Sequence, residues 1–143
     1  MTEPIDIAIE RFNGRYSCSQ SVFSAFAPRY GLSDETALKI ASPFGGGMAR
    51  QGHVCGAVSG ALMVLGLARG SADPQDKETI YQLSQEFMAR FEALHTSMLC
   101  RELIGYDLSV PEQARAARDT GVTGQRCPAF VRSAAEILVE LLA

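Results

Sequence analysis

Apolar residues recur three or four positions apart along almost the whole chain, whereas the alternating pattern of a β-strand is nearly absent. The first apolar stripe is formed by Ile5, Ala8, Ile9 and Phe12, behind Pro4, a residue favoured in a first helical turn. This spacing is typical of amphipathic helices that bury one face. We therefore predict an all-α fold, a single-domain bundle of about six to eight helices that takes up the whole chain of 143 residues.

Capping residues, prolines and glycines set the expected helix boundaries. Beyond the first helix, we predict helices over residues 18–30, 33–42, about 54–69, 73–95, 98–104, 111–118 and from Cys127-Pro128 onward, with Gly31 and Gly105 as stop signals. The segment 54–69 is apolar on nearly every face, so we expect it to be the central buried helix. In the long helix that follows, the predicted core-facing stripe is Ile80, Leu83, Phe87, Phe91 and Leu94.

Charge and hydropathy exclude several classes of partner. The net charge is −3 and the Lys and Arg residues are scattered, so we expect no nucleic-acid partner. The first ten residues lack the basic start and apolar run of an export signal. The longest apolar stretch, residues 54–68, is shorter than the ~20 residues that span a bilayer. We therefore expect no membrane span and a cytoplasmic location, where thiols are usually kept reduced.

Four cysteines, Cys18, Cys55, Cys100 and Cys127, lie far apart in the sequence, and no C-x-x-C pair is present. We predict that three of them, all but Cys100, lie at helix N-termini, where the helix dipole and unpaired N–H groups favour a thiolate. Cys100 is expected inside a helix, with Arg101 beside it. Two interpretations stay open: one joint cysteine site, or four separate cysteines that pack as small apolar residues.

Glycines cluster just before and just after Cys55. A glycine-rich loop lets the backbone approach a ligand closely, and its consecutive N–H groups can bind an anion. The Lys-Ser/Thr of a phosphate-binding loop is missing, and no strand precedes the loop. The small residues that follow, four apart on one helix face, allow the close approach of another helix or of a cofactor. The candidate cofactor-binding residues are Gly45, Gly46, Gly47, Gly52, His53, Gly56 and Gly60.

Four segments, YSCSQSVFSAF, FGGGMARQGHVCGAVSGALMVLGL, LCRELIGYDLS and RCPAFVRSAAEIL, resemble the C_GCAxxG_C_C family of redox-active proteins. That family is characterised by four cysteines and a CGAxxG motif, which here runs from Cys55 to Gly60. The resemblance extends from about Tyr16 to Leu138. It implies that all four cysteines are redox-active or ligand residues, and that an iron–sulfur cluster is compatible with the site. The sequence has no C-x-x-C-H haem attachment site.

Three functions remain as alternatives. In the first, the four thiolates bind an iron–sulfur cluster or another metal for electron transfer, with Arg101 and His53 near the ligands. In the second, there is no cofactor, and Cys55 is the attacking thiolate of a thiol–disulfide reaction. In the third, a structural zinc site of four cysteines makes the chain a binding or assembly module. The expected partner is an unidentified redox protein, and a homodimer stays open.

Overall fold

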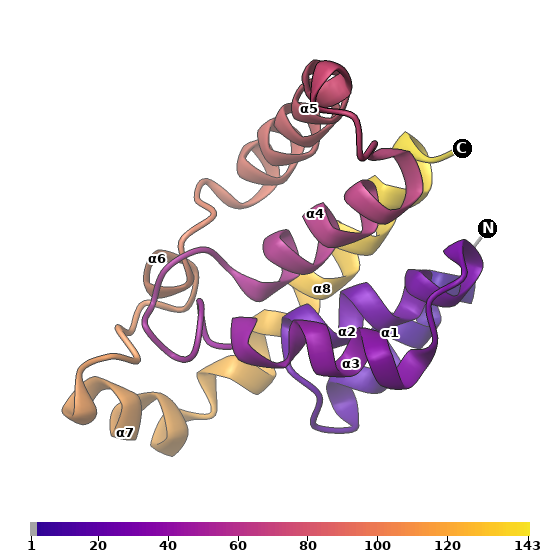
Figure 1. Cartoon of the computed structure of the whole chain (residues 1–143). Coiled ribbons are helices and arrows are strands. Elements are labelled where there is room, and N and C mark those ends of the chain that lie inside the picture. The colour runs from indigo at the N-terminus through magenta and orange to yellow at the C-terminus, as the bar shows by residue number, and fades with distance from the viewer. Residues whose placement is uncertain (1–2) are drawn as a thin grey trace.

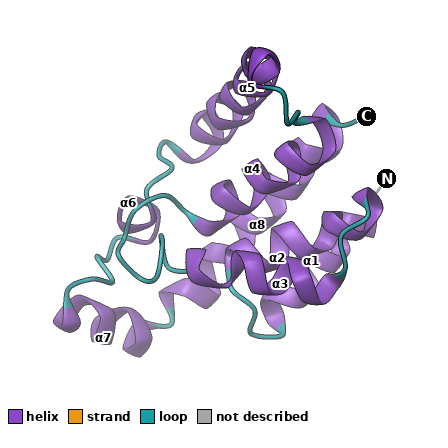
Figure 2. Cartoon of the chain, viewed as in Figure 1, coloured by secondary structure: helices purple, strands orange, loops and turns teal. Residues whose placement is uncertain are grey.

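A computed structural model describes residues 3–143, and these form an all-α single domain without a β-sheet. Figure 2 shows helices joined by loops throughout this part of the chain. The helices are α1 (Glu3–Asn13), α2 (Cys18–Phe26), α3 (Asp34–Ala41), α4 (Gly56–Arg69), α5 (Lys77–His95), α6 (Cys100–Ile104), α7 (Pro111–Thr120) and α8 (Val122–Leu141), with short 3-10 turns η1 (Ala27–Tyr30), η2 (Ser42–Phe44) and η3 (Pro74–Asp76). The predicted fold class is therefore confirmed. None of these helices is both long and apolar enough to cross a membrane.

Helices α2, α4 and α8 form the centre of the bundle. Helix α1 packs on α2 and α8, α3 packs on α2, and α5 packs on α4 and α8. Helices α6 and α7 lie at the end of the bundle that is remote from both chain termini (Figure 1). Helix α4 occupies the central position predicted for the apolar segment 54–69.

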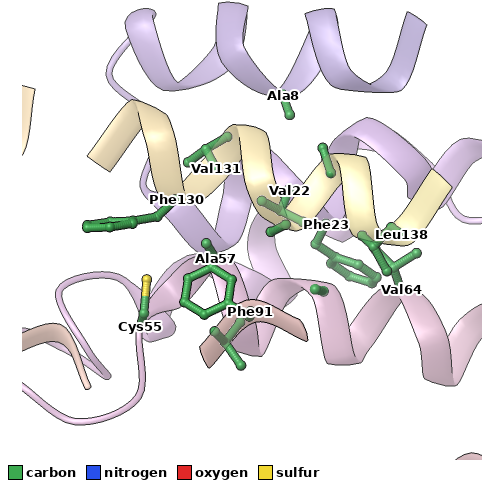
Figure 3. Packing of buried hydrophobic residues seen from close by; sticks show 14 of the residues in the cluster. Ala8, Val22, Phe23, Cys55, Ala57, Val64, Phe91, Phe130, Val131 and Leu138 are labelled. Atoms are coloured by element: carbon green, nitrogen blue, oxygen red, sulfur yellow. The ribbon is translucent and has the colours of Figure 1, made fainter. Parts of the chain in front are cut away.

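Buried apolar side chains from the helices fill the core, and Figure 3 shows part of this cluster. Ala57 and Val64 of α4, Val22 of α2 and Phe91 of α5 all belong to this cluster, and all four side chains are fully buried. Helix α8 contributes Phe130, Val131 and Leu138, and α1 contributes Ala8. Burial of this apolar surface is the main force that holds the helices together.

The N-terminal halves of α2 and α4 touch backbone to backbone. A Cβ atom placed on Gly60 would lie 2.7 Å from the carbonyl oxygen of Ser19, and one on Gly56 would lie 2.9 Å from the Ser19 nitrogen. The expectation that small residues on this face allow close helix approach is thus confirmed. The contact has a consequence for chemistry, because it brings Cys18, next to Ser19, against the start of α4, where Cys55 lies.

Most helix ends follow the expected local signals. Ser17 and Gln20 form a capping box at the start of α2, and Ser33 caps α3. Gly31 and Gly105 adopt left-handed conformations after η1 and α6 and stop them as predicted.

Helix α8 begins five residues before the predicted start. Gly121 ends α7 in a left-handed conformation, and α8 follows at once from Val122, so Cys127 and Pro128 lie inside the helix. Proline has no N–H to donate to the carbonyl of Gly124, four residues earlier. Gly124 is exposed, so water can bind this carbonyl and the helix tolerates the proline.

The predicted core stripe of α5 was wrong at its last position. Phe87 and Phe91 are fully buried, but Leu94 is 62% exposed. His95 faces the core side of α5 instead, because it lies four residues after Phe91 and therefore on the same helix face. Its ring packs edge-on against Phe130, with ring centroids 4.9 Å apart. The His95 Nε2 also lies 2.9 Å from the Ser133 hydroxyl oxygen.

The backbone contact between α2 and α4 predicts opposite effects for two alanine substitutions on the same helix. Gly60→Ala would force α2 away from α4 and should lower the free energy of unfolding by about 1–3 kcal/mol. A Cβ on Gly66 meets no described atom within 4 Å, so Gly66→Ala should raise the stability by up to about 1 kcal/mol. Urea unfolding followed by circular dichroism measures both. Equal effects of the two substitutions would contradict this packing.

Candidate functional site: a cavity lined by four cysteines

The four cysteines come together around one cavity of about 200 Å³. Each comes from a different part of the fold: Cys18 begins α2, Cys55 precedes α4, Cys100 begins α6 and Cys127 lies in α8. All four are free thiols; three are buried and Cys18 is half-buried. The other lining residues are Phe12, Ser17, Gly46, Gly47, Arg50, Gly56, Leu103, Ile104, Leu108, Thr123 and Phe130. Of the two interpretations left open by the sequence, the structure supports the joint site.

Three of the cysteines do lie at helix N-termini, but they are not the three predicted. Cys18 and Cys55 are as expected, whereas Cys100 begins α6 and Cys127 lies in the interior of α8. The prediction was wrong for Cys127 because proline is favoured in a first helical turn, whereas α8 starts before Pro128. It was wrong for Cys100 because α6 begins at Cys100 itself, two residues after the predicted start.

A short backbone pairing holds Cys55 beside Cys100. Val54 and Leu99 form an isolated antiparallel bridge between the loop before α4 and the loop before α6. The Cys55 N–H donates to the Met98 carbonyl at 2.7 Å, and the Cys100 N–H donates to the His53 carbonyl at 2.6 Å. Side chains alternate sides along such a pair, so those of Cys55 and Cys100 emerge on the same side. The two cysteines are thus fixed by main-chain contacts.

The glycine-rich loop forms one wall of the cavity in an unusual backbone conformation. Five consecutive residues, 46–50, have positive φ angles, and three of them are not glycine: Met48, Ala49 and Arg50. A left-handed turn costs about 1–2 kcal/mol for each residue that carries a Cβ. Backbone hydrogen bonds compensate for this cost, since each N–H of residues 48–53 donates to a carbonyl of residues 43–48. These six N–H groups are therefore not free to bind an anion.

Gly47 is where this loop meets the cysteine site. A Cβ atom on Gly47 would lie 2.7 Å from the Cβ of Cys100 and 2.7 Å from the nitrogen of His53. Its φ of +70° adds a conformational reason for glycine. The loop is therefore a closely packed wall.

The thiols differ in their electrostatic surroundings. Hydrogen bonds to Cys127 and Cys55, burial and the nearby sulfur charges raise the pKa of Cys18 well above its usual range. The hydrogen bond from Cys18 lowers the pKa of Cys55, and the N–H groups of Ala57 and Val58 in the first turn of α4 lower it further, against the effect of burial. Burial, with charges on Cys55, Cys127 and Asp107, raises the pKa of Cys100 to about 12. Of Cys18, Cys55 and Cys100, it is therefore Cys55 that most readily becomes a thiolate, and Cys18 donates a hydrogen bond to it.

The candidate glycines and His53 separate into two groups. Gly46, Gly47 and Gly56 line the cavity. The others contact protein elsewhere: a Cβ on Gly45 would lie 2.7 Å from the Ser17 Cβ, one on Gly52 would lie 2.9 Å from an Asp107 carboxylate oxygen, and Gly60 faces Ser19. His53 is exposed and is not a lining residue. The Arg101 guanidinium donates to the Gly52 carbonyl at 3.2 Å and is likewise outside the cavity lining.

A scan against protein families matches residues 16–141 to the family described as "Putative redox-active protein (C_GCAxxG_C_C)". The chain belongs to this family. No curated protein and no solved structure gives a significant match. The C_GCAxxG_C_C match covers all four cysteines and the cavity lining except Phe12.

Several lining residues of this family member were not identified from the sequence. Phe12 was predicted only as part of the apolar stripe of the first helix, and no sequence signal marked Leu108 or Thr123 as lining residues. Arg50 lies inside the glycine loop, and its position three residues after the glycine run was the one signal that could have indicated it.

The grouping of the side chains bears on metal binding. Within residues 3–143, no three His, Cys, Asp or Glu side chains form a group that could hold a metal ion. A zinc site of four cysteines requires four thiolates around one ion, so this arrangement does not support it. An iron–sulfur cluster distributes its cysteine ligands over several iron atoms and does not need three thiols around one ion. The cysteines lining the cavity remain compatible with a cluster.

Gly47→Ala should be the more damaging of two glycine substitutions at left-handed positions. It adds a clash with Cys100 and the His53 backbone to the conformational cost, so we expect a loss of about 2–5 kcal/mol. Gly105 also has a positive φ, but a Cβ there meets no described atom within 4 Å, so Gly105→Ala should lose only about 1–2 kcal/mol. Thermal and urea unfolding measure both. Similar losses would show that the loop does not press on the cysteine site.

Iodoacetamide should modify Cys55 at a lower pH than Cys100. Because its pKa is lowered, Cys55 carries more thiolate at any given pH, and its rate should reach half of its maximum below the usual thiol value of about 8.5. The rate at Cys100 should rise only as the pH approaches about 12. Cys18→Ala removes the hydrogen bond to Cys55 and should move the Cys55 profile to higher pH, whereas Cys100→Ala should not. Peptide mass spectrometry over a pH series measures the rates, and an unshifted Cys55 profile would contradict this account.

Proposed function

We propose that the protein carries out thiol–disulfide exchange, with Cys55 as the attacking thiolate and Cys18 as the resolving thiol. The observation that supports this most directly is that both thiols line one cavity, where their interaction lowers the pKa of Cys55 and raises that of Cys18. A nucleophilic thiolate beside a protonated partner is what such an exchange requires.

The reaction takes two steps. The Cys55 thiolate attacks one sulfur of a substrate disulfide, forms a mixed disulfide and expels the other substrate half as a thiolate. That thiolate takes up a proton, and Cys18 supplies one as its own thiol ionises. The Cys18 sulfur then attacks the Cys55 sulfur, forms the Cys18–Cys55 disulfide and releases the second substrate thiol. The two cysteines together give up two electrons to the substrate. Of the two protons that the substrate halves take up, Cys18 supplies one and water supplies the other, because Cys55 reacts as a thiolate.

A cellular dithiol, small or protein-borne, would return the protein to its reduced form and be oxidised to a disulfide. Attack on the Cys18 sulfur releases Cys55 as the leaving group, and a thiol of low pKa leaves faster. The same lowered pKa of Cys55 therefore favours both the attack on substrate and the reduction of the protein. This partner is the redox protein expected from the sequence, or a small dithiol in its place.

The surroundings of the two thiols support this chemistry. The side chains of Phe12, Leu103, Ile104, Leu108 and Phe130 line the cavity and limit the access of water. In Figure 3 the Cys55 sulfur points from the loop before α4 toward the side of the core where Phe130 lies. In such a setting the N–H groups at the start of α4 act more strongly on the thiolate than they would in water.

Single-cysteine variants test the assignment. Reduced protein is mixed with 2-hydroxyethyl disulfide, and the products are mapped by intact mass and by non-reducing peptide digestion. The wild type should form a Cys18–Cys55 disulfide, and Cys18→Ala should stop at the mixed disulfide on Cys55. Cys55→Ala should react at least about tenfold more slowly, because it removes the thiol whose pKa is lowered. Cys100→Ala serves as the control and should react as the wild type does. A Cys55→Ala variant that reacts at the wild-type rate would refute the proposal.

A second candidate is electron transfer through an iron–sulfur cluster, and the convergence of all four cysteines on one cavity favours it. Cys18, Cys55, Cys100 and Cys127 would hold the cluster, which would supply one-electron chemistry when bound. Purification without oxygen, with iron, zinc and sulfide assays on the same sample, separates the two candidates. Iron and sulfide in near-equal amounts support the cluster, and a colourless, metal-free protein with four titratable thiols supports thiol–disulfide exchange.

A further inference from the structure

Among residues 3–143, Arg50 is the only charged side chain that lines the four-cysteine cavity. The protein as a whole carries a net charge of −3, yet none of the carboxylates in this part of the chain lines the cavity. Apart from the thiols, the lining consists of apolar side chains, glycines and the hydroxyl groups of Ser17 and Thr123. Arg50 and Thr123 are exposed, whereas Cys55 and Phe130 are buried, so the guanidinium belongs to the mouth of the cavity and the nucleophile to its interior.

The backbone at Arg50 is strained in a way that glycine would relieve. Its φ is +61°, and it ends the run of five left-handed residues. An arginine there costs about 1–2 kcal/mol in conformational energy. Strained residues of this kind are concentrated at binding and catalytic sites, where the surrounding structure holds them in place.

The loop itself holds Arg50 at the cavity. A Cβ atom on Gly46 would lie 2.8 Å from the Arg50 Cγ and 2.9 Å from its Cα, so the side-chain stem rests against the Gly46 backbone. The Arg50 N–H donates to the Gly45 carbonyl at 3.0 Å. These contacts fix the backbone and the first side-chain carbons of Arg50, and the guanidinium group stays available to a ligand.

The guanidinium of Arg50 makes no ion pair with any side chain of residues 3–143. Among residues 3–143, three other arginines do form ion pairs: Arg11 with Asp34, Arg29 with Glu3, and Arg90 with Glu86 and Glu140. An unpaired guanidinium at the mouth of an apolar cavity is suited to bind a carboxylate, which it can contact through two N–H groups at once.

We propose that the substrate of the cysteine site is a small disulfide that carries a carboxylate, with Arg50 binding the carboxylate while Cys55 attacks the sulfur. This inference rests on the proposed thiol–disulfide function. The cavity volume of about 200 Å³ limits the substrate to a small molecule or to one half of it. The reaction balance is that given above: the substrate disulfide becomes two thiols, and Cys18 and Cys55 become a disulfide.

Three probes of similar size and different charge test the inference: dithiodiglycolate, an anion; 2-hydroxyethyl disulfide, which is neutral; and cystamine, a cation. For each probe, the rate at which it oxidises the reduced protein is measured, and so is the rate at which it oxidises 2-mercaptoethanol. The ratio of the two rates corrects for differences in the intrinsic reactivity of the three disulfides. The wild type should favour the anion over the neutral probe by roughly three- to tenfold, with the cation slowest. High salt should reduce this preference, because the arginine is exposed.

Arg50→Gln should abolish the preference for the anion and leave the rate with the neutral probe within about twofold of the wild type. Its pH profile with the neutral probe should also be unchanged, since Arg50 is not among the groups that shift the pKa of Cys55. Arg132→Gln is the matched control: it removes the same charge from an exposed site on α8 that does not line the cavity, and it should keep the preference.

Each other outcome overturns the inference. A wild type without preference for the anion refutes the substrate class while the thiol–disulfide function stands. An Arg50→Gln variant that slows all three probes equally shows that Arg50 only supports the loop. An equal loss of preference in Arg132→Gln shows a general charge effect. A protein that no probe oxidises refutes the proposed function together with the inference.

Discussion

The N-terminal halves of α2 and α4 meet at Gly56 and Gly60 with no side chain between the two backbones, and the cysteine site depends on this contact. Any Cβ at these positions would strike the backbone of Ser19, so only glycine allows the two helices to come this close. Because Cys18 and Cys55 stand at the starts of the same two helices, the contact that packs the core also brings the two thiols together. Stability and chemistry therefore share one constraint.

The loop before α4 is held by a second set of constraints. Its left-handed residues are unfavourable one by one, but their N–H groups from residue 48 onward all find carbonyl partners, and Gly47 fits tightly against Cys100. The Val54–Leu99 bridge then joins this loop to the start of α6. A segment rich in glycine would be mobile in isolation, and here the surrounding contacts make it a wall of fixed shape.

The thiols are distinguished by their surroundings, since all four have the same chemistry. Cys55 has a hydrogen bond from Cys18 and two N–H groups of α4 nearby, and these outweigh its burial. Cys100 also begins a helix, but burial and neighbouring negative charges dominate there and hold its proton. A helix N-terminus therefore favours a thiolate only where hydrogen bonds to the sulfur exceed the cost of removing it from water.

The sequence by itself determined the helical fold class, most helix ends and the need for glycine before and after Cys55. These features depend on apolar periodicity and on capping residues within a few positions of each other, and both can be read directly from the sequence. It did not determine that Cys127 lies inside α8, that the half-buried His95 rather than Leu94 packs against Phe130, or that Arg50 lines the cavity. Only the tertiary structure decided these points, because they rest on contacts between residues far apart in the chain, such as Gly60 with Ser19 and Gly47 with Cys100. The pKa shifts of Cys18, Cys55 and Cys100 likewise depend in part on groups that other segments of the fold bring near.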